Sequence, residues 1–200
     1  MQSNNKQWLH KQKAVTLVEL LIVIAIVGII SSIALPSYRS LVITNRINSF
    51  ATNLHGSLLL ARSEAIKRSR SVAICKSSNA DHTVPSCDVT ASIAGTNTGW
   101  GSGWLIFVDS NNDGLFLAPD VLLRVQSNFI SSVNDGSIVP TNPDGSAGNE
   151  FIAFNATGQT VAAINFVINR PTSDTVASHN KAVCVLVGGR ARSGLAPNCP

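Results

Sequence analysis

The sequence predicts an α+β protein, in which one long N-terminal helix packs on an antiparallel β domain. Two patterns predict this fold. A predominantly apolar run at residues 15–35 is followed by apolar residues at helical spacing. After residue 71, short apolar segments alternate with clusters of Gly, Asn, Ser, Asp and Pro, which is typical of strands and turns. Two hundred residues suffice for one globular domain and an anchor.

The apolar run is long enough to cross a membrane. Leu20–Ile30 contains no polar side chain, and the 21 residues from Val15 to Leu35 match the length of about 20 that a spanning helix needs. Three lysines and no acidic residue precede the run, so we expect the N-terminus to stay in the cytoplasm. The same lysines supply three of the four excess positive charges, so net charge does not indicate a nucleic-acid partner.

A cleaved secretory signal peptide is the alternative interpretation of this run. Ser32-Ile33-Ala34 could serve as its small-residue cleavage site. Glu19 favours a retained segment, because an ionisable side chain within a membrane segment costs a few kcal/mol and is usually kept for a partner or a function.

Residues 14–19 resemble the class III signal of type IV pilins and type II secretion pseudopilins. That signal has a small residue before the cleavage site and Glu at the fifth mature position. Ala14, followed by Val15-Thr16-Leu17-Val18-Glu19, is similar to it in register. The resemblance implies that a prepilin peptidase removes the leader, that Val15 is N-methylated, and that Glu19 pairs with the N-terminus of a neighbouring pilin subunit.

The resemblance also implies an organisation and a location. Residues 1–14 are the cytoplasmic leader, 15–36 the membrane and assembly half of the helix, 37–70 its amphipathic half, and 71–200 a periplasmic or extracellular β domain. Such a protein is a single-pass inner-membrane protein before assembly. It then becomes part of a pilus fibre that runs from the periplasm to the cell surface.

The amphipathic half is predicted from apolar residues that recur every three or four positions. The helix is expected to run to about Ser69 with these residues against the β domain. They are Ile43, Ile47, Phe50, Leu54, Leu58, Ala61 and Ala65.

Six strands are predicted beyond the helix. Two of the segments that separate them, 77–97 and 131–148, are long and expected to be mobile. The strands are Val72–Cys75, Trp104–Val108, Val121–Val125, Phe151–Phe154, Ala163–Ile168 and Ala182–Val187. Three motifs in this region resemble, in their order, motifs of the GspH/FimT family. They are Trp100-Gly101-Ser102-Gly103-Trp104 with the strand that follows, Asn111-Asn112-Asp113-Gly114, and Phe154-Asn155-Ala156-Thr157-Gly158.

Four cysteines lie beyond the predicted membrane segment, in a compartment where disulfides form. Their spacing does not resemble CxxC metal or redox motifs. Several connectivities are possible, and sequence proximity favours Cys75 with Cys87 and Cys184 with Cys199 over crossed pairs or free thiols.

Neither an enzyme nor a cofactor-binding protein is predicted. His10, His55, His82 and His179 show no metal-ligand spacing, and there is no nucleophile elbow or phosphate-binding loop.

An acidic segment between two predicted strands permits two interpretations. Asp109-x-Asn111-x-Asp113-Gly114 matches the opening of a calcium loop, and Asp120 stands where such a loop has Glu. The same residues are typical of a hairpin turn. We favour the turn and assign no metal ligand from the sequence.

The C-terminal segment 188–194 carries two arginines between glycines. Arg190 and Arg192 would project to one face of an extended backbone, where guanidinium groups suit phosphate oxygens. Solvated arginines in a β-turn are the alternative. Gly189-Arg190-Ala191-Arg192 resembles the Gly-Arg-x-Arg motif of FimT-like minor pilins, which implies phosphate contacts to DNA by both arginines, with Gly189 shaping the loop. We expect Lys181 to add nearby charge.

The expected function is therefore that of a minor pilin of a type IV pilus that binds extracellular DNA, without reading its sequence, for uptake in natural transformation. The alternative is a structural subunit without DNA binding. It would be a GspH-like pseudopilin of type II secretion or a priming subunit at a pilus tip.

Overall fold

The computed structural model describes residues 15–196, apart from the side chains of residues 34–36. The predicted leader, including Ala14, and the predicted disulfide partner Cys199 lie outside the described residues. The chain divides into two units, Met1–Leu41 and Val42–Pro200, which are described in turn.

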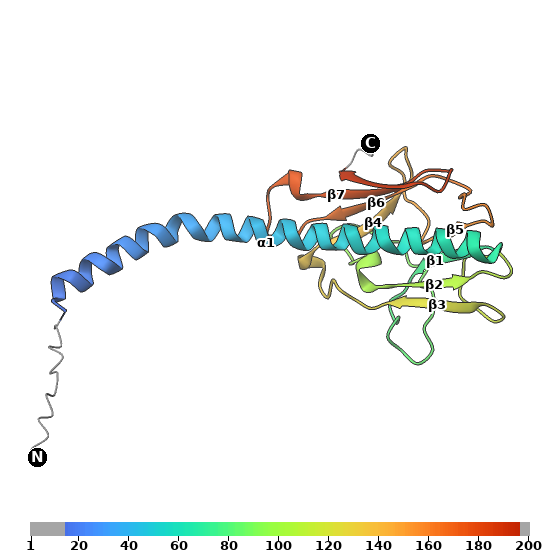
Figure 1. Cartoon of the computed structure of the whole chain (residues 1–200), viewed down its shortest axis with the longest axis horizontal. Coiled ribbons are helices and arrows are strands. Elements are labelled where there is room, and N and C mark those ends of the chain that lie inside the picture. Colours follow the sequence, from blue (N-terminus) through green and yellow to red (C-terminus); the bar gives the residue numbers. More distant parts are fainter. Residues whose placement is uncertain (1–14, 197–200) are drawn as a thin grey trace, which may run out of the picture. The chain divides into compact units, whose positions relative to one another are not determined.

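Helix α1 (Leu17–Arg68) begins directly after Thr16 (Figure 1). The Glu19 backbone N–H donates to Thr16 Oγ1 at 3.2 Å, so Thr16 and Glu19 occupy the first and last positions of a capping-box pattern. In the first unit, the large apolar side chains from Val15 to Ile33 are 51–74% exposed. The most apolar 18-residue window of α1 has a mean hydropathy of 2.7, so by length and composition this helix could cross a membrane.

In the second unit, one face of α1 is buried. The residues that the spacing predicted are buried, with Ile43 only partly so, and Ala51 and Ser57 are buried beside them. The buried predicted residues are Ile47, Phe50, Leu54, Leu58, Ala61 and Ala65. The helix ends at Arg68, and Ser69 takes a positive φ of 51°.

The antiparallel β domain consists of two four-stranded sheets (Figure 1). The first has the order β3 (Val121–Gln126), β2 (Trp104–Val108), β1 (Val72–Lys76) and β5 (Phe151–Phe154). The second has the order β4 (Ser137–Thr141), β6 (Ile164–Asn169), β7 (Lys181–Val185) and β8 (Ala191–Leu195). Short 3₁₀ helices occupy Trp100–Ser102, Val133–Asp135 and Ala177–His179.

All six predicted strands are present, but two strands were not predicted. β4 lies within the segment 131–148, which was wrongly expected to be a mobile loop, and it contains Pro140. β8 contains Ser193 and Gly194, which have low strand preference. Both are edge strands of the second sheet, where pairing with one neighbour tolerates such residues.

Helix α1 and both sheets share one hydrophobic core. Leu54 and Leu58 of the helix pack there with Trp104 of the first sheet and Phe166 of the second. A second, smaller cluster covers the other face of the first sheet, where segments 77–97 and 109–120 contribute Ala80, Cys87 and Phe116. As a result, β1 and β2 are buried at every position.

Candidate nucleic-acid interface

Strands β7 and β8 form a hairpin that contains the predicted arginine pair. Its tip is closed by two backbone hydrogen bonds, from Leu186 N–H to Arg190 C=O at 3.0 Å and from Gly189 N–H to Leu186 C=O at 2.7 Å. The strand register places Arg192 opposite Cys184. Most of segment 188–194, which was expected to form a loop, belongs to β8, and Arg192 lies on the extended backbone of this strand.

Gly189 is buried at the tip of this hairpin and has a φ of +74°. A Cβ atom at this position would overlap the carbonyl oxygen of Gly158, in the turn that follows β5. Beside this contact, Thr160 N–H donates to Val187 C=O at 2.9 Å and the Thr160 hydroxyl donates to Leu186 C=O at 3.2 Å. The absence of a side chain at Gly189 lets the hairpin tip pack directly on this turn.

Helix α1 contacts the hairpin on another side. Arg62 Nη2 donates to Gly188 C=O at 3.1 Å, and His55 Nε2 lies 3.4 Å from Ala191 O. Neither contact was predicted from the sequence. The sequence feature that could have indicated them is the spacing of seven residues between His55 and Arg62, which places both side chains on one face of a helix.

The two arginines lie on the face of the second sheet that points away from α1. Val183 and Val185 point into the core, and side chains alternate along paired strands, so Arg192 and Cys184 point outward. Arg190 continues the same alternation. Arg190 is exposed and Arg192 is half-buried. The four strands of this sheet contain no Asp or Glu, so no acidic side chain on them opposes the positive charge.

Lys181 does not lie beside the arginines, contrary to the prediction. It pairs with Leu195 at the other end of the hairpin, three residues from Cys184. An odd separation places it on the opposite face of the strand. With His55 and Ser193 it lines a pocket of about 240 Å³ between α1 and β8.

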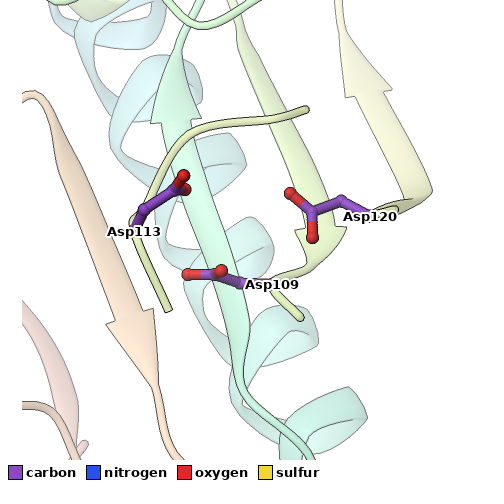
Figure 2. A group of neighbouring side chains, drawn as sticks. All are labelled: Asp109, Asp113 and Asp120. Carbon is purple, nitrogen blue, oxygen red and sulfur yellow. The ribbon is translucent and has the colours of Figure 1, made fainter. Parts of the chain in front are cut away.

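The acidic segment does not form a tight hairpin turn. Residues 109–120 form a long loop between β2 and β3, and this loop brings one oxygen of each of Asp109, Asp113 and Asp120 within 4.8 Å of the others (Figure 2). Burial raises the pKa of Asp109, which is only 2% exposed.

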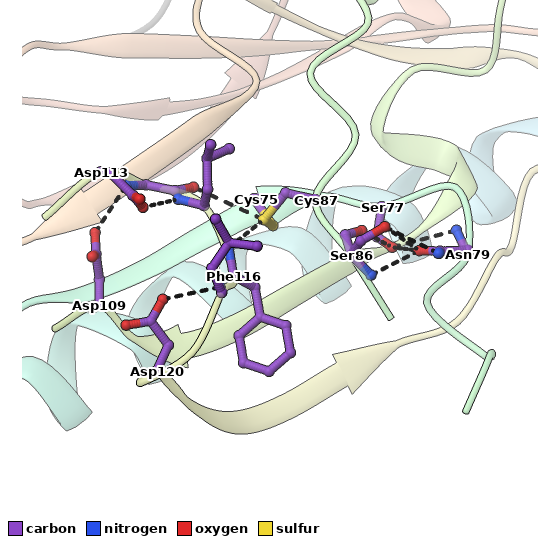
Figure 3. Close-up of a disulfide and its surroundings, with 12 residues drawn as sticks. Cys75, Ser77, Asn79, Ser86, Cys87, Asp109, Asp113, Phe116 and Asp120 are labelled. Carbon is purple, nitrogen blue, oxygen red and sulfur yellow. Dashed lines mark hydrogen bonds between the residues drawn. A yellow bond between two sulfur atoms is a disulfide. The ribbon is translucent and has the colours of Figure 1, made fainter. Parts of the chain in front are cut away.

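A disulfide joins Cys75 and Cys87, as sequence proximity favoured, with their Cα atoms 5.5 Å apart (Figure 3). The Phe116 N–H donates to Cys87 Sγ at 3.1 Å, so the disulfide fastens both covering segments to the first sheet. Cys184 is also disulfide-bonded, and Cys199 lies outside the described residues.

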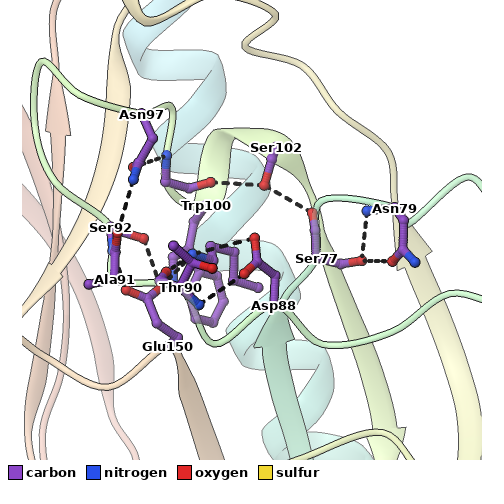
Figure 4. Close-up of polar contacts among 12 residues, drawn as sticks. Ser77, Asn79, Asp88, Thr90, Ala91, Ser92, Asn97, Trp100, Ser102 and Glu150 are labelled. Atoms are coloured by element: carbon purple, nitrogen blue, oxygen red, sulfur yellow. Dashed lines mark hydrogen bonds and ion pairs between the residues drawn. The ribbon is translucent and has the colours of Figure 1, made fainter.

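A buried ion-pair network, which the sequence analysis missed, holds segment 77–97 (Figure 4). The Lys76 side chain is 3% exposed, and its Nζ lies 3.6 Å from Glu150 Oε2 and 3.7 Å from Asp88 Oδ2. Lys76 also donates to the Thr90 carbonyl, and Glu150 accepts from Trp100 Nε1 at 3.0 Å. The segment expected to be mobile is therefore tied to β1 and, through Glu150, to the 3₁₀ helix that precedes β2.

The sequence model of the family described as type II transport protein GspH matches residues 51–189, which is more than half of the chain. The chain belongs to the GspH family. A second model, the prokaryotic N-terminal methylation motif, matches residues 9–35 of this GspH-family protein and so includes Ala14, Val15 and Glu19. The GspH match ends at Gly189, immediately before the two arginines.

Two crystal structures of the type IV minor pilin FimU of Pseudomonas aeruginosa are similar to this GspH-family chain. One is 21% identical, with a TM-score of 0.49 and coverage of 76% of this chain and 90% of FimU. The other is 20% identical, with a TM-score of 0.47 and coverage of 75% and 92%. No curated protein matches the sequence.

The family and the methylation motif together make this chain a member of the minor pilins and pseudopilins. The apolar helix fits a protein anchored in the inner membrane that is processed by a prepilin peptidase and then assembles with other pilin subunits.

Proposed function

We propose that this GspH-family protein is a minor pilin that binds extracellular DNA through Arg190 and Arg192. One observation carries the proposal. Both arginines project from the same face of a hairpin whose tip is fixed by Gly189 and Arg62, and the sheet around them has no acidic residue. The fixed backbone of the hairpin tip holds both arginines on one face, and each guanidinium group can contact phosphate oxygens with two parallel hydrogen bonds.

The proposed contacts are to the phosphate backbone. Such contacts position a protein on DNA without reading bases, so the site would accept any sequence. Two contacts alone give an affinity in the non-specific range, about 10⁻⁴ to 10⁻⁶ M, which several subunits in one fibre would strengthen. On the surface of a pilus, this site would capture DNA for uptake in natural transformation as the fibre retracts.

Replacing both arginines with glutamine is expected to weaken DNA binding by about 30-fold, since each phosphate contact contributes on the order of 1 kcal/mol. The dependence of log Kd on log salt concentration should also become shallower by about 2. Fluorescence anisotropy of labelled duplex DNA with a fragment that begins at Ser37 measures both quantities. This fragment retains the whole compact unit Val42–Pro200.

The matched control is Arg39→Gln with Arg124→Gln. It removes the same charge from two exposed positions outside the hairpin, and it should retain most of the affinity. Equal affinity of the Arg190→Gln/Arg192→Gln fragment and the native fragment across the salt titration, with both folded by circular dichroism, would contradict the DNA-binding proposal.

A purely structural subunit is the second candidate. The matching family is described as a type II transport protein, and its match stops before Arg190. In that case the chain would assemble as a GspH-like pseudopilin or as a priming subunit, and the loss of both arginines would leave secretion or pilus assembly unchanged.

The mature chain is expected to begin with N-methylated Val15. Thr16 starts helix α1 and Glu19 stands in its first turn, so cleavage after Ala14 would leave the charged N-terminus within reach of the Glu19 carboxylate of a neighbouring subunit. Two charges that are costly in lipid would then offset one another. Mass spectrometry of protein from sheared fibres or membranes gives the N-terminus, and cleavage after Ala34 would instead indicate a secreted protein.

A further inference from the structure

Loop 109–120 gathers negative charge that no side chain in the described part of the molecule neutralises. One oxygen from each of Asp109, Asp113 and Asp120 lies within 4.8 Å of the others. Among residues 15–196, none of these carboxylates forms an ion pair. Like charges at this distance repel, so the arrangement favours a positive charge at its centre.

Asp109 provides a second, independent indication of a ligand. Its side chain is buried, and among residues 15–196 its Oδ1 atom has no hydrogen-bond partner. All other carboxylate oxygens of the cluster accept hydrogen bonds. Asp109 Oδ2 accepts from Gly114 N–H, Asp113 from Leu115 N–H and from Asn111 Nδ2, and Asp120 from Ser110 N–H and Leu117 N–H. A buried carboxylate oxygen without a partner is destabilising, and binding of a cation removes this cost.

The three side chains range from buried to exposed, so one edge of the cluster lies at the surface. Figure 2 shows Asp113 and Asp120 pointing toward each other from opposite sides of the loop, with Asp109 below them. Asp113 is exposed, Asp120 is half-buried and Asp109 is buried. A cation could therefore bind at the Asp109 carboxylate and keep water molecules on its exposed side.

The chemistry of the donors selects a hard cation. All candidate ligands are oxygen atoms, and the nearby sulfur of Cys87 belongs to a disulfide, so it offers no thiolate to a soft metal. We propose that loop 109–120 binds a calcium ion through the carboxylates of Asp109, Asp113 and Asp120. Calcium accepts irregular carboxylate geometry, whereas magnesium requires nearly ideal octahedral geometry and loses water reluctantly.

The bound ion would stabilise the outer side of the first sheet. Gly114 and Phe116 of the same loop contact Cys87, and Phe116 packs on the cluster that buries Phe107 (Figure 3). Calcium would thus act together with the Cys75–Cys87 disulfide in holding loop 109–120 against the first sheet. Three carboxylates in an open loop are typical of the weak affinities of extracellular modules, with Kd of about 10⁻⁴ to 10⁻³ M.

The test is a titration of the full-length protein in a neutral detergent, after treatment with a chelator. Isothermal titration calorimetry with CaCl₂ is expected to show one saturable site, and 10 mM Ca²⁺ should raise the Tm by roughly 3 to 10 °C. Asp113→Asn keeps an oxygen that can accept from Leu115 N–H but removes one charge. It should weaken calcium binding by about tenfold or more.

Asp144→Asn is the matched control, because Asp144 also accepts from a backbone N–H two residues later but lies outside the cluster. It should bind calcium as the native protein does. Asp109→Asn should abolish the calcium-dependent shift in Tm, with near-ultraviolet circular dichroism reporting whether the chain is folded. No saturable heat up to 10 mM Ca²⁺, native calcium affinity in a folded Asp113→Asn protein, or an equal response to Mg²⁺ would overturn the assignment.

Discussion

Replacing Glu150 with alanine is expected to destabilise the β domain by about 3 kcal/mol, because it leaves a buried lysine with one fewer counter-charge. The Lys76 side chain is 3% exposed, and the Trp100 and Ser92 N–H groups would also lose their acceptor (Figure 4). The Tm of the fragment that begins at Ser37 should fall by roughly 6 to 12 °C. Calorimetry or circular dichroism on heating measures this change.

A double variant identifies the cause of the loss. In Lys76→Met/Glu150→Leu, both charges are replaced by apolar groups, and the part of the loss that comes from the unpaired Lys76 charge should return, although the Trp100 and Ser92 N–H groups still lack their acceptor. Glu64→Gln is the control, because its ion pairs with Lys67 and Arg68 lie on the surface of α1 and its Tm should hardly change. An unchanged Tm for Glu150→Ala would show that this network does not hold segment 77–97.

Gly189→Ala is expected to destabilise the protein by about 3 kcal/mol, because the change imposes two costs at one position. An alanine at a φ of +74° is strained, and its Cβ atom would overlap the backbone oxygen of Gly158, which cannot move aside as a flexible side chain can. The hairpin tip must shift, and Arg190 moves with it. Denaturant unfolding of the fragment measures the loss of stability, and anisotropy should show weaker DNA binding under conditions in which the variant is folded.

The neighbouring glycine provides a close control for this prediction. A Cβ atom at Gly188 would meet no atom within 4 Å, and the φ of Gly188 lies outside the left-handed range. Gly188→Ala should therefore change neither stability nor DNA binding. If Gly189→Ala is as stable as Gly188→Ala, the tight contact between the hairpin tip and the turn after β5 does not exist in solution.

The helix and most strands were predictable because their signals are local. The buried residues of α1 from Ile47 to Ala65 follow a spacing of three or four that any amphipathic helix shows, and the apolar runs of β1, β2 and β5 mark strands without reference to partners. β4 and β8 carry no such signal. They are strands because β6 and β7 offer unpaired edges to them.

The two candidate sites also differ in how much of each could be predicted from local sequence. Arg190 and Arg192 are two residues apart, so their common face follows from strand alternation alone, and their separation from Lys181 follows from the register of β7 and β8. For the acidic loop, the sequence indicated the residue types but favoured a simple turn. The convergence of Asp120 with Asp109 and Asp113 depends on the path of a long loop packed on the Cys75–Cys87 disulfide.

Composition and short-range periodicity encode the apolar N-terminal helix, its amphipathic continuation, the presence of a disulfide-bearing β domain and the common face of the two arginines. The division into two sheets, the buried pair of Lys76 and Glu150, the close contact of Gly189 with Gly158 and the gathering of three carboxylates are visible in the tertiary structure alone. The physical reason is that these features arise between segments far apart in the chain. Which segments meet depends on how helix α1 and both sheets together exclude water from a single core.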